Sequence, residues 1–507
     1  MKPINFVLVT WLLGCALPVL AQQHSHPAPE RLGAVTFPTS CAPGVQSGFE
    51  RGVALMHSFA YAASEEAFRT VADADPSCAL AHWGIAMSYF HQLWTPPDTE
   101  ELRKGLAQID RAQQLGAGSM RERQFIEAAA AYYRDSDHLS HVVRAKAYER
   151  AMAEVARSNP HDAEAQIFYA LALIATASPA DQSHANQKQA AEILEPLFRS
   201  VPQHPGLAHY LIHAYDSAEL APRGLAAARA YSKIAPSAPH ALHMPSHIFT
   251  RLGYWDDSIA SNRAARVAAR AEGDVGEELH AMDYLTYAYL QRGRETDAGH
   301  VIDDLRAMSE LPTADFKVDY AATAMPVRFA VERRQWAAAA SLQPLSQSAP
   351  HVAAIVYWAR ALGQARRGHP HQSDSDLAKL NVCLHQLQSS GNPYWAIQTE
   401  VLVEEAQAWI LQAQGMADEA TRRMRSAADK EDAVEKLPVT PGPIVPAREQ
   451  LGELLLELKR PRDALREFQA TLIVAPGRRG ALTGAVHAAE LVGDVQTAAR
   501  LRAELNR

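Results

Sequence analysis

The chain has 507 residues, of which 48% are hydrophobic and 21% are charged. This balance can bury a sizeable core and excludes a broadly disordered chain. The formal net charge of −8 at neutral pH gives no strongly basic surface, so we expect no nucleic-acid partner and no bulk attraction to an anionic membrane. Aromatic residues are only 7% of the chain, which favours packed helices over sheets.

The first 21 residues predict a secretory signal peptide. Lys2 supplies the positive end, and residues 4–13 form a short apolar run. The run is too short for a membrane span, and no other segment of the sequence is apolar for long enough. We therefore expect a periplasmic or secreted protein in an oxidising compartment. The alternative is a lipoprotein signal that ends at Cys15.

Three cysteines follow the signal peptide, and two of them are candidates for a disulfide. Cys41 and Cys78 each lie just before a predicted helix. In an oxidising compartment they could close a loop of roughly forty residues, and the alternative is a pair of free thiols. Their spacing does not match the Cys-x-x-Cys pattern of zinc sites. Residues 22–41, which lead up to the first cysteine, are expected to be a flexible leader.

An internal repeat organises the rest of the chain. Ala464, Phe468 and Pro476 stand in an A-x-x-x-F…P spacing, and Pro202 and Pro236 lie 34 residues apart. These spacings resemble the tetratricopeptide repeat (TPR) family, in which each unit is a pair of antiparallel helices. The resemblance implies an all-α, right-handed TPR-like superhelical solenoid of roughly twelve antiparallel helix pairs.

The repeat is interrupted near the C-terminus by a proline-rich segment. We expect the solenoid to span residues 42–435 and a C-terminal TPR pair to span residues 447–507. Residues 436–446 between them read K-L-P-V-T-P-G-P-I-V-P, which breaks the helical pattern. We interpret this segment as a plain loop before the last repeats. The alternative is a rigid loop folded over the groove of the solenoid.

Both H-x-x-x-H pairs of the chain lie in one short region. His209 and His213 form the first pair, and His243 and His247 form the second pair 34 residues later. An i, i+4 spacing puts both rings of a pair on one helix face, and stacked repeats set the two pairs side by side. Each pair could chelate a transition metal such as Zn, Cu or Fe. Histidines that order neighbouring helices, or that contact a ligand without metal, are alternatives.

The repeat register extends this region into a predicted ligand groove. In the TPR family, fixed positions of the first helix in each pair line the concave face where ligands bind. Counting from Pro205 and Pro239 places one aspartate and one further histidine on that face, and neighbouring repeats add more polar residues. The predicted groove residues are His57, His91, Asp216, His240, His280, Asp283 and Tyr287.

Pro245 lies between the two histidines of the second pair. A proline inside a helix removes a hydrogen bond and clashes with the preceding turn. We therefore expect one of two arrangements. Either the helix starts at Met244, or it kinks there and frees a carbonyl beside His243 and His247.

A narrower resemblance adds a group but no activity. The blocks H-P-G-L-A-H-Y-L-I-H-A-Y-D, A-P-H-A-L-H-M-P-S-H-I-F and P-A-R-E-Q-L-G resemble secreted bacterial TPR proteins of unknown function. No phosphate loop, dinucleotide fingerprint or nucleophile elbow occurs in the sequence, so no catalytic residue is assigned and we lean against an enzyme.

The sequence therefore supports three hypotheses for the function of the protein. The preferred hypothesis is a scaffold that binds a peptide or protein partner in the His-rich groove. The second hypothesis is a metal-binding protein or metal-dependent enzyme that uses both H-x-x-x-H pairs. The third is a structural assembly subunit.

Overall fold

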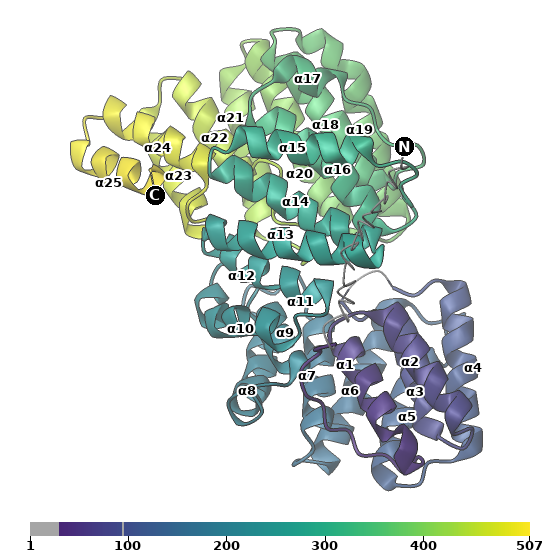
Figure 1. The fold of residues 1–507 in the computed structure, drawn as a ribbon. Helices are drawn as coiled ribbons and strands as arrows, with labels where there is room; N and C mark the ends of the chain where they lie inside the picture. Colours follow the sequence, from purple (N-terminus) through teal and green to yellow (C-terminus); the bar gives the residue numbers. More distant parts are fainter. Residues whose placement is uncertain (1–29, 94–95, 507) are drawn as a thin grey trace, which may run out of the picture. The chain divides into compact units, whose positions relative to one another are not determined.

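The structure is a computed structural model that describes residues 30–93 and 96–506, and Figure 1 shows its fold. The predicted signal peptide at residues 1–21, the alternative lipid site at Cys15 and the first part of the expected leader lie outside the described residues. Within the described ranges every regular element is a helix, and no strand occurs. The predicted all-α class is therefore confirmed.

The N-terminal helices pack around one hydrophobic cluster. Phe37, Phe49, Phe68 and Trp83 lie at its centre and are almost completely buried. Serine and aspartate caps start several of these helices, as at Asp98 and Ser119. The elements are η1 (Pro43–Val45), α1 (Gln46–His57), α2 (Tyr61–Ala74), α3 (Ala79–Tyr89), α4 (Thr99–Leu115), α5 (Met120–Tyr133), α6 (His141–Ser158) and α7 (Ala163–Ala175).

The central helices continue the same stacking, with each helix packed on the next along the chain. Proline at the first helical position starts α9 and α11, where its missing N–H has no intrahelical partner to lose. The elements are α8 (Ala185–Ser200), α9 (Pro205–Ala214), α10 (Ala221–Ile234), α11 (Pro239–His243), α12 (Pro245–Arg251), α13 (Trp255–Glu272), α14 (Val275–Gln291) and α15 (Glu295–Ala307).

The C-terminal helices share one large hydrophobic cluster that runs from α16 to α25. No helix in the described part of the chain is both long and apolar enough to cross a membrane. The elements are α16 (Phe316–Glu332), α17 (Trp336–Ser341), α18 (Pro350–Arg366), η2 (Pro370–Ser373), α19 (Asp374–Ser389), α20 (Pro393–Ala413), α21 (Ala417–Asp432), α22 (Ala447–Glu457), α23 (Pro461–Val474), α24 (Arg479–Leu491) and α25 (Val495–Leu505).

Two phenylalanines show how the repeat packs its helices. The Phe68 ring lies between Gly52 of α1 and Gly84 of α3, and a Cβ added to Gly52 would lie 2.8 Å from Phe68 Cε1. At the other end of the chain, Phe468 packs against Gly452 in the same way, at 2.7 Å. A side chain at either glycine would overlap the ring, so the glycines allow the helices to approach closely. This shared arrangement fits the predicted helix-pair repeat.

The described half of the expected leader is packed against the helices. Phe37 is fully buried, the Ala34 N–H donates to the Gln203 carbonyl at 2.9 Å, and the Ser237 N–H donates to the Arg31 carbonyl at 3.2 Å. The expectation of a flexible leader is therefore wrong for residues 31–41. The segment is ordered because burial of Phe37 among aromatic rings stabilises it by more free energy than the lost conformational entropy costs.

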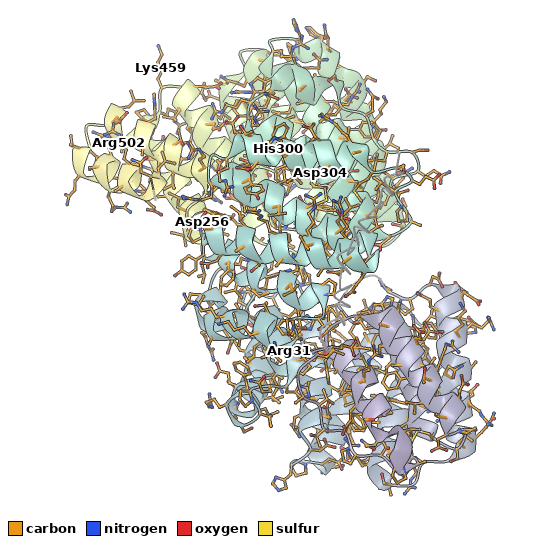
Figure 2. The ribbon with its side chains drawn as sticks, viewed as in Figure 1. Arg31, Asp256, His300, Asp304, Lys459 and Arg502 are labelled. Atoms are coloured by element: carbon orange, nitrogen blue, oxygen red, sulfur yellow. A yellow bond between two sulfur atoms is a disulfide. The ribbon has the colours of Figure 1, made fainter. Side chains whose placement is uncertain are left out.

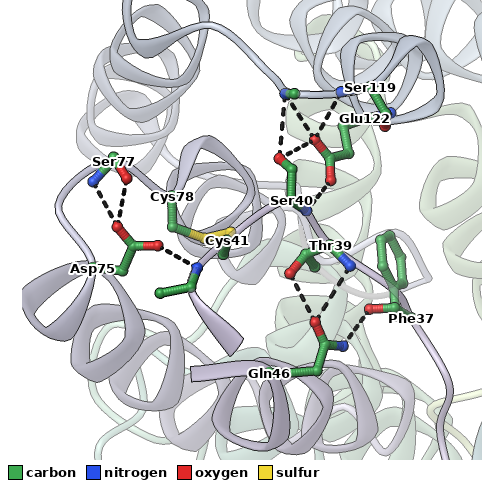
Figure 3. The surroundings of a disulfide bond; sticks show 12 residues. Phe37, Thr39, Ser40, Cys41, Gln46, Asp75, Ser77, Cys78, Ser119 and Glu122 are labelled. Carbon is green, nitrogen blue, oxygen red and sulfur yellow. Dashed lines mark hydrogen bonds between the residues drawn. A yellow bond between two sulfur atoms is a disulfide. The ribbon is translucent and has the colours of Figure 1, made fainter. Parts of the chain in front are cut away.

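Cys41 and Cys78 are joined by a disulfide at the end of this segment (Figure 3). The Ala42 N–H donates to Asp75 Oδ2 at 2.7 Å, and Ser40 Oγ donates to Glu122 Oε2 at 2.6 Å. The bond ties residue 41 to the residue that precedes α3. The segment is thus held by a covalent bond and by buried carboxylates on two helices.

The proline-rich segment 436–446 folds against the helices instead of linking two separate units. The Tyr284 hydroxyl donates toward the carbonyls of Pro438 and Thr440, each at 3.2 Å. Arg328 donates to the Pro443 carbonyl at 2.8 Å and to the Gly442 carbonyl at 3.2 Å. Our interpretation of a plain loop is therefore wrong. Prolines bring no N–H groups that need partners, so Tyr284 and Arg328 suffice to bury this backbone.

Loss of the disulfide should destabilise the N-terminal helices. We expect the variant Cys41→Ser/Cys78→Ser to lose about 3–4 kcal/mol of unfolding free energy, because the bond closes a loop of about forty residues. Chemical denaturation followed by circular dichroism measures the loss. Reducing agent should destabilise the wild type equally and leave the variant unchanged, and an equal effect on both proteins would contradict the assignment.

Candidate metal centre

Four helices, α9, α11, α12 and α14, carry the central histidines. His209 and His213 lie on α9, His240 and His243 on α11, and His247 on α12. His280 lies on α14. All six side chains are at least 95% buried. They contrast with His300 on α15, labelled in Figure 2, which is exposed.

Pro245 begins the second of two short helices that a single residue joins. Helix α11 ends at His243, and α12 begins at Pro245. Met244 between them keeps helical angles, with φ −52° and ψ −36°, and the His247 N–H donates to the Met244 carbonyl at 3.1 Å. The second helix therefore starts at Pro245, one residue after the start at Met244 that we considered. The rings of His240 and His247 both remain next to that of His243.

The imidazoles form two groups of three. In triad A, which consists of His209, His213 and His240, the His209 Nε2 lies 3.1 Å from His213 Nε2 and 3.2 Å from His240 Nε2. One nitrogen from each ring lies within 4.8 Å of the others.

Triad B consists of His243, His247 and His280. The His243 and His247 Nε2 atoms lie 3.0 Å apart, and the rings of His243 and His280 have centroids 4.2 Å apart. Again one nitrogen from each ring lies within 4.8 Å of the others. Both triads thus point three ring nitrogens at one small volume.

A backbone and a carboxylate acceptor fix two rings of triad A, those of His209 and His240. His209 Nδ1 lies 2.6 Å from the carbonyl oxygen of His57, which can only accept. His240 Nδ1 lies 3.2 Å from Glu277 Oε2. Burial opposes ionisation of Glu277, but Lys317 and His240 hold the pKa of its carboxyl well below the usual range. Both Nδ1 atoms therefore carry the proton, and a neutral ring then has its lone pair on Nε2.

The rings of triad B are fixed in the same way. His243 Nδ1 donates to Asn262 Oδ1 at 2.6 Å, since the Asn262 amide nitrogen itself donates to the Ser258 carbonyl. His247 Nδ1 donates to Asp216 Oδ2 at 2.9 Å. Burial opposes ionisation of Asp216, but Lys436 and Arg251 hold its pKa well below the usual range. Hydrogen-bond acceptors on Nδ1 are the usual outer partners of metal-bound histidines.

The close Nε2 contacts are repulsive unless a cation lies between them. Burial lowers the pKa of His209, His213, His243, His247 and His280, which opposes protonation at neutral pH. With Nδ1 already donating on both rings, the neutral pairs His209–His240 and His243–His247 would each face each other with lone pairs only. The geometry therefore fits imidazoles that converge on a metal ion.

The structure divides the predicted metal ligands differently from the sequence. His209 and His213 share triad A with His240, while His243 and His247 share triad B with His280. We expected His240 and His280 to be groove residues, and their burial beside the pairs makes them the third members. Asp216 contacts His247 from behind and is not one of the converging atoms.

A third buried cluster was missed in the sequence. Glu164 lies between two imidazoles, with His57 Nε2 at 2.9 Å and His204 Nε2 at 2.9 Å from its two oxygens. The Tyr210 hydroxyl contacts His57 Nδ1 at 2.9 Å. Burial opposes ionisation of Glu164, but His57 and His204 hold the pKa of its carboxyl below the usual range. Each Nε2 is thus engaged by the carboxylate, which indicates a structural network.

The other predicted groove residues do not join either triad. His91 lies on the Tyr61 ring, with centroids 4.5 Å apart. Asp283 lies 3.8 Å from Arg328 Nε, and burial raises its pKa to about 6. Tyr287 accepts a hydrogen bond from Arg478. Beside these residues, Tyr284 and Arg328 hold the proline-rich segment against α14 and α16.

A cavity of about 370 Å³ lies beside this proline-rich segment. Tyr320, Tyr394 and Trp395 give it an aromatic wall, and Arg251 and Lys436 form part of another wall. Those two cations also contact Asp216, at 2.8 and 3.0 Å. The cavity is therefore one layer of side chains away from His247.

Comparison with known proteins identifies no family. No protein-family model matches the chain, and no curated protein matches it. Among solved structures, it is similar to the human IFIT1 dimer with m7Gppp-AAAA, with 13% identity, a TM-score of 0.34, and coverage of 84% of this chain and 89% of that chain. A monomeric IFIT1 mutant with Gppp-AAAA gives the same identity and TM-score, with 85% and 90% coverage. Likeness at this level carries no information on the ligand of this chain.

The Glu164 network should contribute to stability. We expect Glu164→Gln to lower the unfolding free energy by about 1–3 kcal/mol, because one buried imidazole loses its acceptor. Since the folded-state pKa of Glu164 is lowered, the difference should be full at pH 7 and shrink as pH falls below about 4.3, where the unfolded carboxylate protonates. Urea denaturation at pH 7 and at a pH below about 4.3 measures this difference in unfolding free energy.

Glu100→Gln is the matched control, since Glu100 forms an exposed pair with Arg103 and should change little. Equal stability of Glu164→Gln and the wild type at pH 7 would contradict the network.

Proposed function

We propose that this protein binds transition-metal ions at triads A and B. The observation that carries the proposal is the set of three Nε2 contacts at 3.0 to 3.2 Å within the triads. Four of the five rings in these contacts already donate through Nδ1 to fixed acceptors, namely His209, His240, His243 and His247. Two nitrogens held about 2.0–2.1 Å from one ion lie about 2.9–3.4 Å apart for octahedral or tetrahedral angles. The distances therefore suit ligands of a common ion.

The ligand set indicates the class of metal. Neutral imidazoles suit Zn, Cu and Fe, and the carboxylates close to the triads contact ring nitrogens instead of the converging volume. Three protein ligands leave a coordination position open, which is typical of sites that bind a further small molecule. A purely structural zinc site normally has four protein ligands.

The peptide-binding hypothesis loses its basis at the histidines. Those side chains are buried, and the proline-rich segment covers the neighbouring inner face. A helical binding scaffold remains consistent with the fold, and a peptide or protein partner remains a prediction. Such a partner would have to bind a surface other than the triads.

We also propose that the protein works outside the cytoplasm. The sequence of residues 1–21 supports export, and the Cys41–Cys78 disulfide suits an oxidising compartment. Fractionation of cells that produce the full chain tests this location.

Metal content tests the proposed function directly. Tag-free protein, reconstituted with Cu, Zn or Fe and analysed for elements, should hold two ions per chain of the preferred metal, because each triad supplies one set of ligands. The variants His209→Gln/His213→Gln and His243→Gln/His247→Gln should each hold one ion.

His300→Gln is the control, since its ring is exposed and belongs to neither triad. Circular dichroism verifies that each variant is folded. Less than about a tenth of an equivalent of each metal in the wild type would contradict metal binding.

The outer partners should tune each site separately. We expect Asp216→Asn to weaken metal binding at triad B by about 10–100-fold, because the amide orients His247 less firmly than the carboxylate does. Glu277→Gln is the matched change at triad A. Competition with a chelator measures both affinities, and a loss at both triads from either change would contradict separate outer partners.

A further inference from the structure

We infer that triads A and B hold their two ions as one dinuclear centre, with a small anion bridging the ions. The inference rests on the proposed function, since both triads must bind metal. It deepens that function by naming the ligand class of the open coordination positions.

The two triads are adjacent because one stretch of helix supplies both. His240 of triad A and His243 of triad B lie on α11, with ring centroids 6.1 Å apart. His213 of triad A and His247 of triad B have centroids 6.0 Å apart. Since each ion lies only about 2 Å beyond its nitrogens, the two ions would lie within a few ångströms of each other.

An aromatic ring packs against each triad. Phe59 lies over triad A, with its centroid 4.4 Å from that of His209 and 5.4 Å from that of His240. Tyr284 lies over triad B, 4.8 Å from His243 and 5.1 Å from His247. Phe59 has no donor atom, and the Tyr284 hydroxyl is engaged by the Pro438 and Thr440 carbonyls. Neither ring therefore supplies a fourth ligand, and the adjacent triads leave the open positions of the two ions to a shared small ligand.

The backbone at Phe59 adds an independent observation. Its φ is +54°, in the left-handed region that a bulky side chain rarely adopts. This conformation follows directly after α1 and places the Phe59 ring against three imidazoles of triad A. Strain of this kind gathers at functional sites.

Charge around the triads calls for an anionic ligand. Six neutral imidazoles cannot offset the charge of two divalent ions. The nearby carboxylates are Asp216, Glu277, Asp283 and Glu435, and each pairs with a cation. The paired cations are Lys436 and Arg251 for Asp216, Lys317 for Glu277, Arg328 for Asp283 and Arg251 for Glu435. The surroundings are thus neutral in sum, and a buried anion between the ions reduces the remaining charge.

The test loads the full chain with Cu(II) and counts spins by electron paramagnetic resonance. At two ions per chain, a bridged pair should show less than about a tenth of its copper as spin signal, because ions held as close as in two-metal sites couple. His243→Gln/His247→Gln should bind one copper at triad A with full signal. His300→Gln should match the wild type.

A second measurement needs no variant. Wild type loaded with one Zn(II) and one Cu(II) should show the full signal of one copper, because zinc has no unpaired electron. Azide, followed by visible absorption, should bind once per two coppers in the wild type and once per copper in the triad B variant, since a bridge serves both ions.

The outcomes separate the two proposals. Two coppers per chain with two full spins, or one azide bound per copper in the wild type, would overturn the dinuclear centre and leave metal binding intact. Absence of bound copper, zinc and iron would overturn the proposed function itself.

Discussion

The arrangement of the central helices depends on buried imidazoles whose Nδ1 atoms are held by fixed acceptors. The carbonyl of His57, the amide oxygen of Asn262 and the carboxylates of Glu277 and Asp216 each accept a hydrogen bond from one ring N–H. Once that proton is committed, the opposite nitrogen can only accept, and the ring becomes a directed electron-pair donor. The helices that carry these rings must then be stacked so that the Nε2 lone pairs point toward a common volume.

Neighbouring cations keep the two carboxylates among these acceptors, Asp216 and Glu277, in their ionised form. Asp216 is held by Lys436 from the proline-rich segment and by Arg251 from α12, so a residue near the C-terminal helices sets the state of a group beside His247. Burial alone would favour the neutral acid at such a position. The proline-rich segment therefore belongs to the surroundings of triad B as well as to the packing of the inner face.

Sequence reasoning located the region of the site because the repeat interval is regular. The 34-residue spacing correctly put both H-x-x-x-H pairs side by side, and the repeat register put His240 and His280 on the same face. It could not divide six histidines into two groups, since that depends on side-chain directions across four helices. Glu164 and His204 gave no pattern, because their contact joins residues 40 apart outside the repeat register. The burial of residues 436–446 depends on Tyr284 and Arg328, which lie more than a hundred residues earlier.

The glycine-flanked phenylalanines at the two ends of the chain differ in kind from the polar interior between them. Phe68 and Phe468 lie in apolar contacts that are complete without any ligand. Under the proposed function, the central rings become mutually favourable when a cation joins them. Because repeats in a stack chiefly contact their neighbours, an empty centre would be the weakest contact between successive helices. A bound ion would then clamp the helices on either side of it, and its occupancy would set how readily they separate.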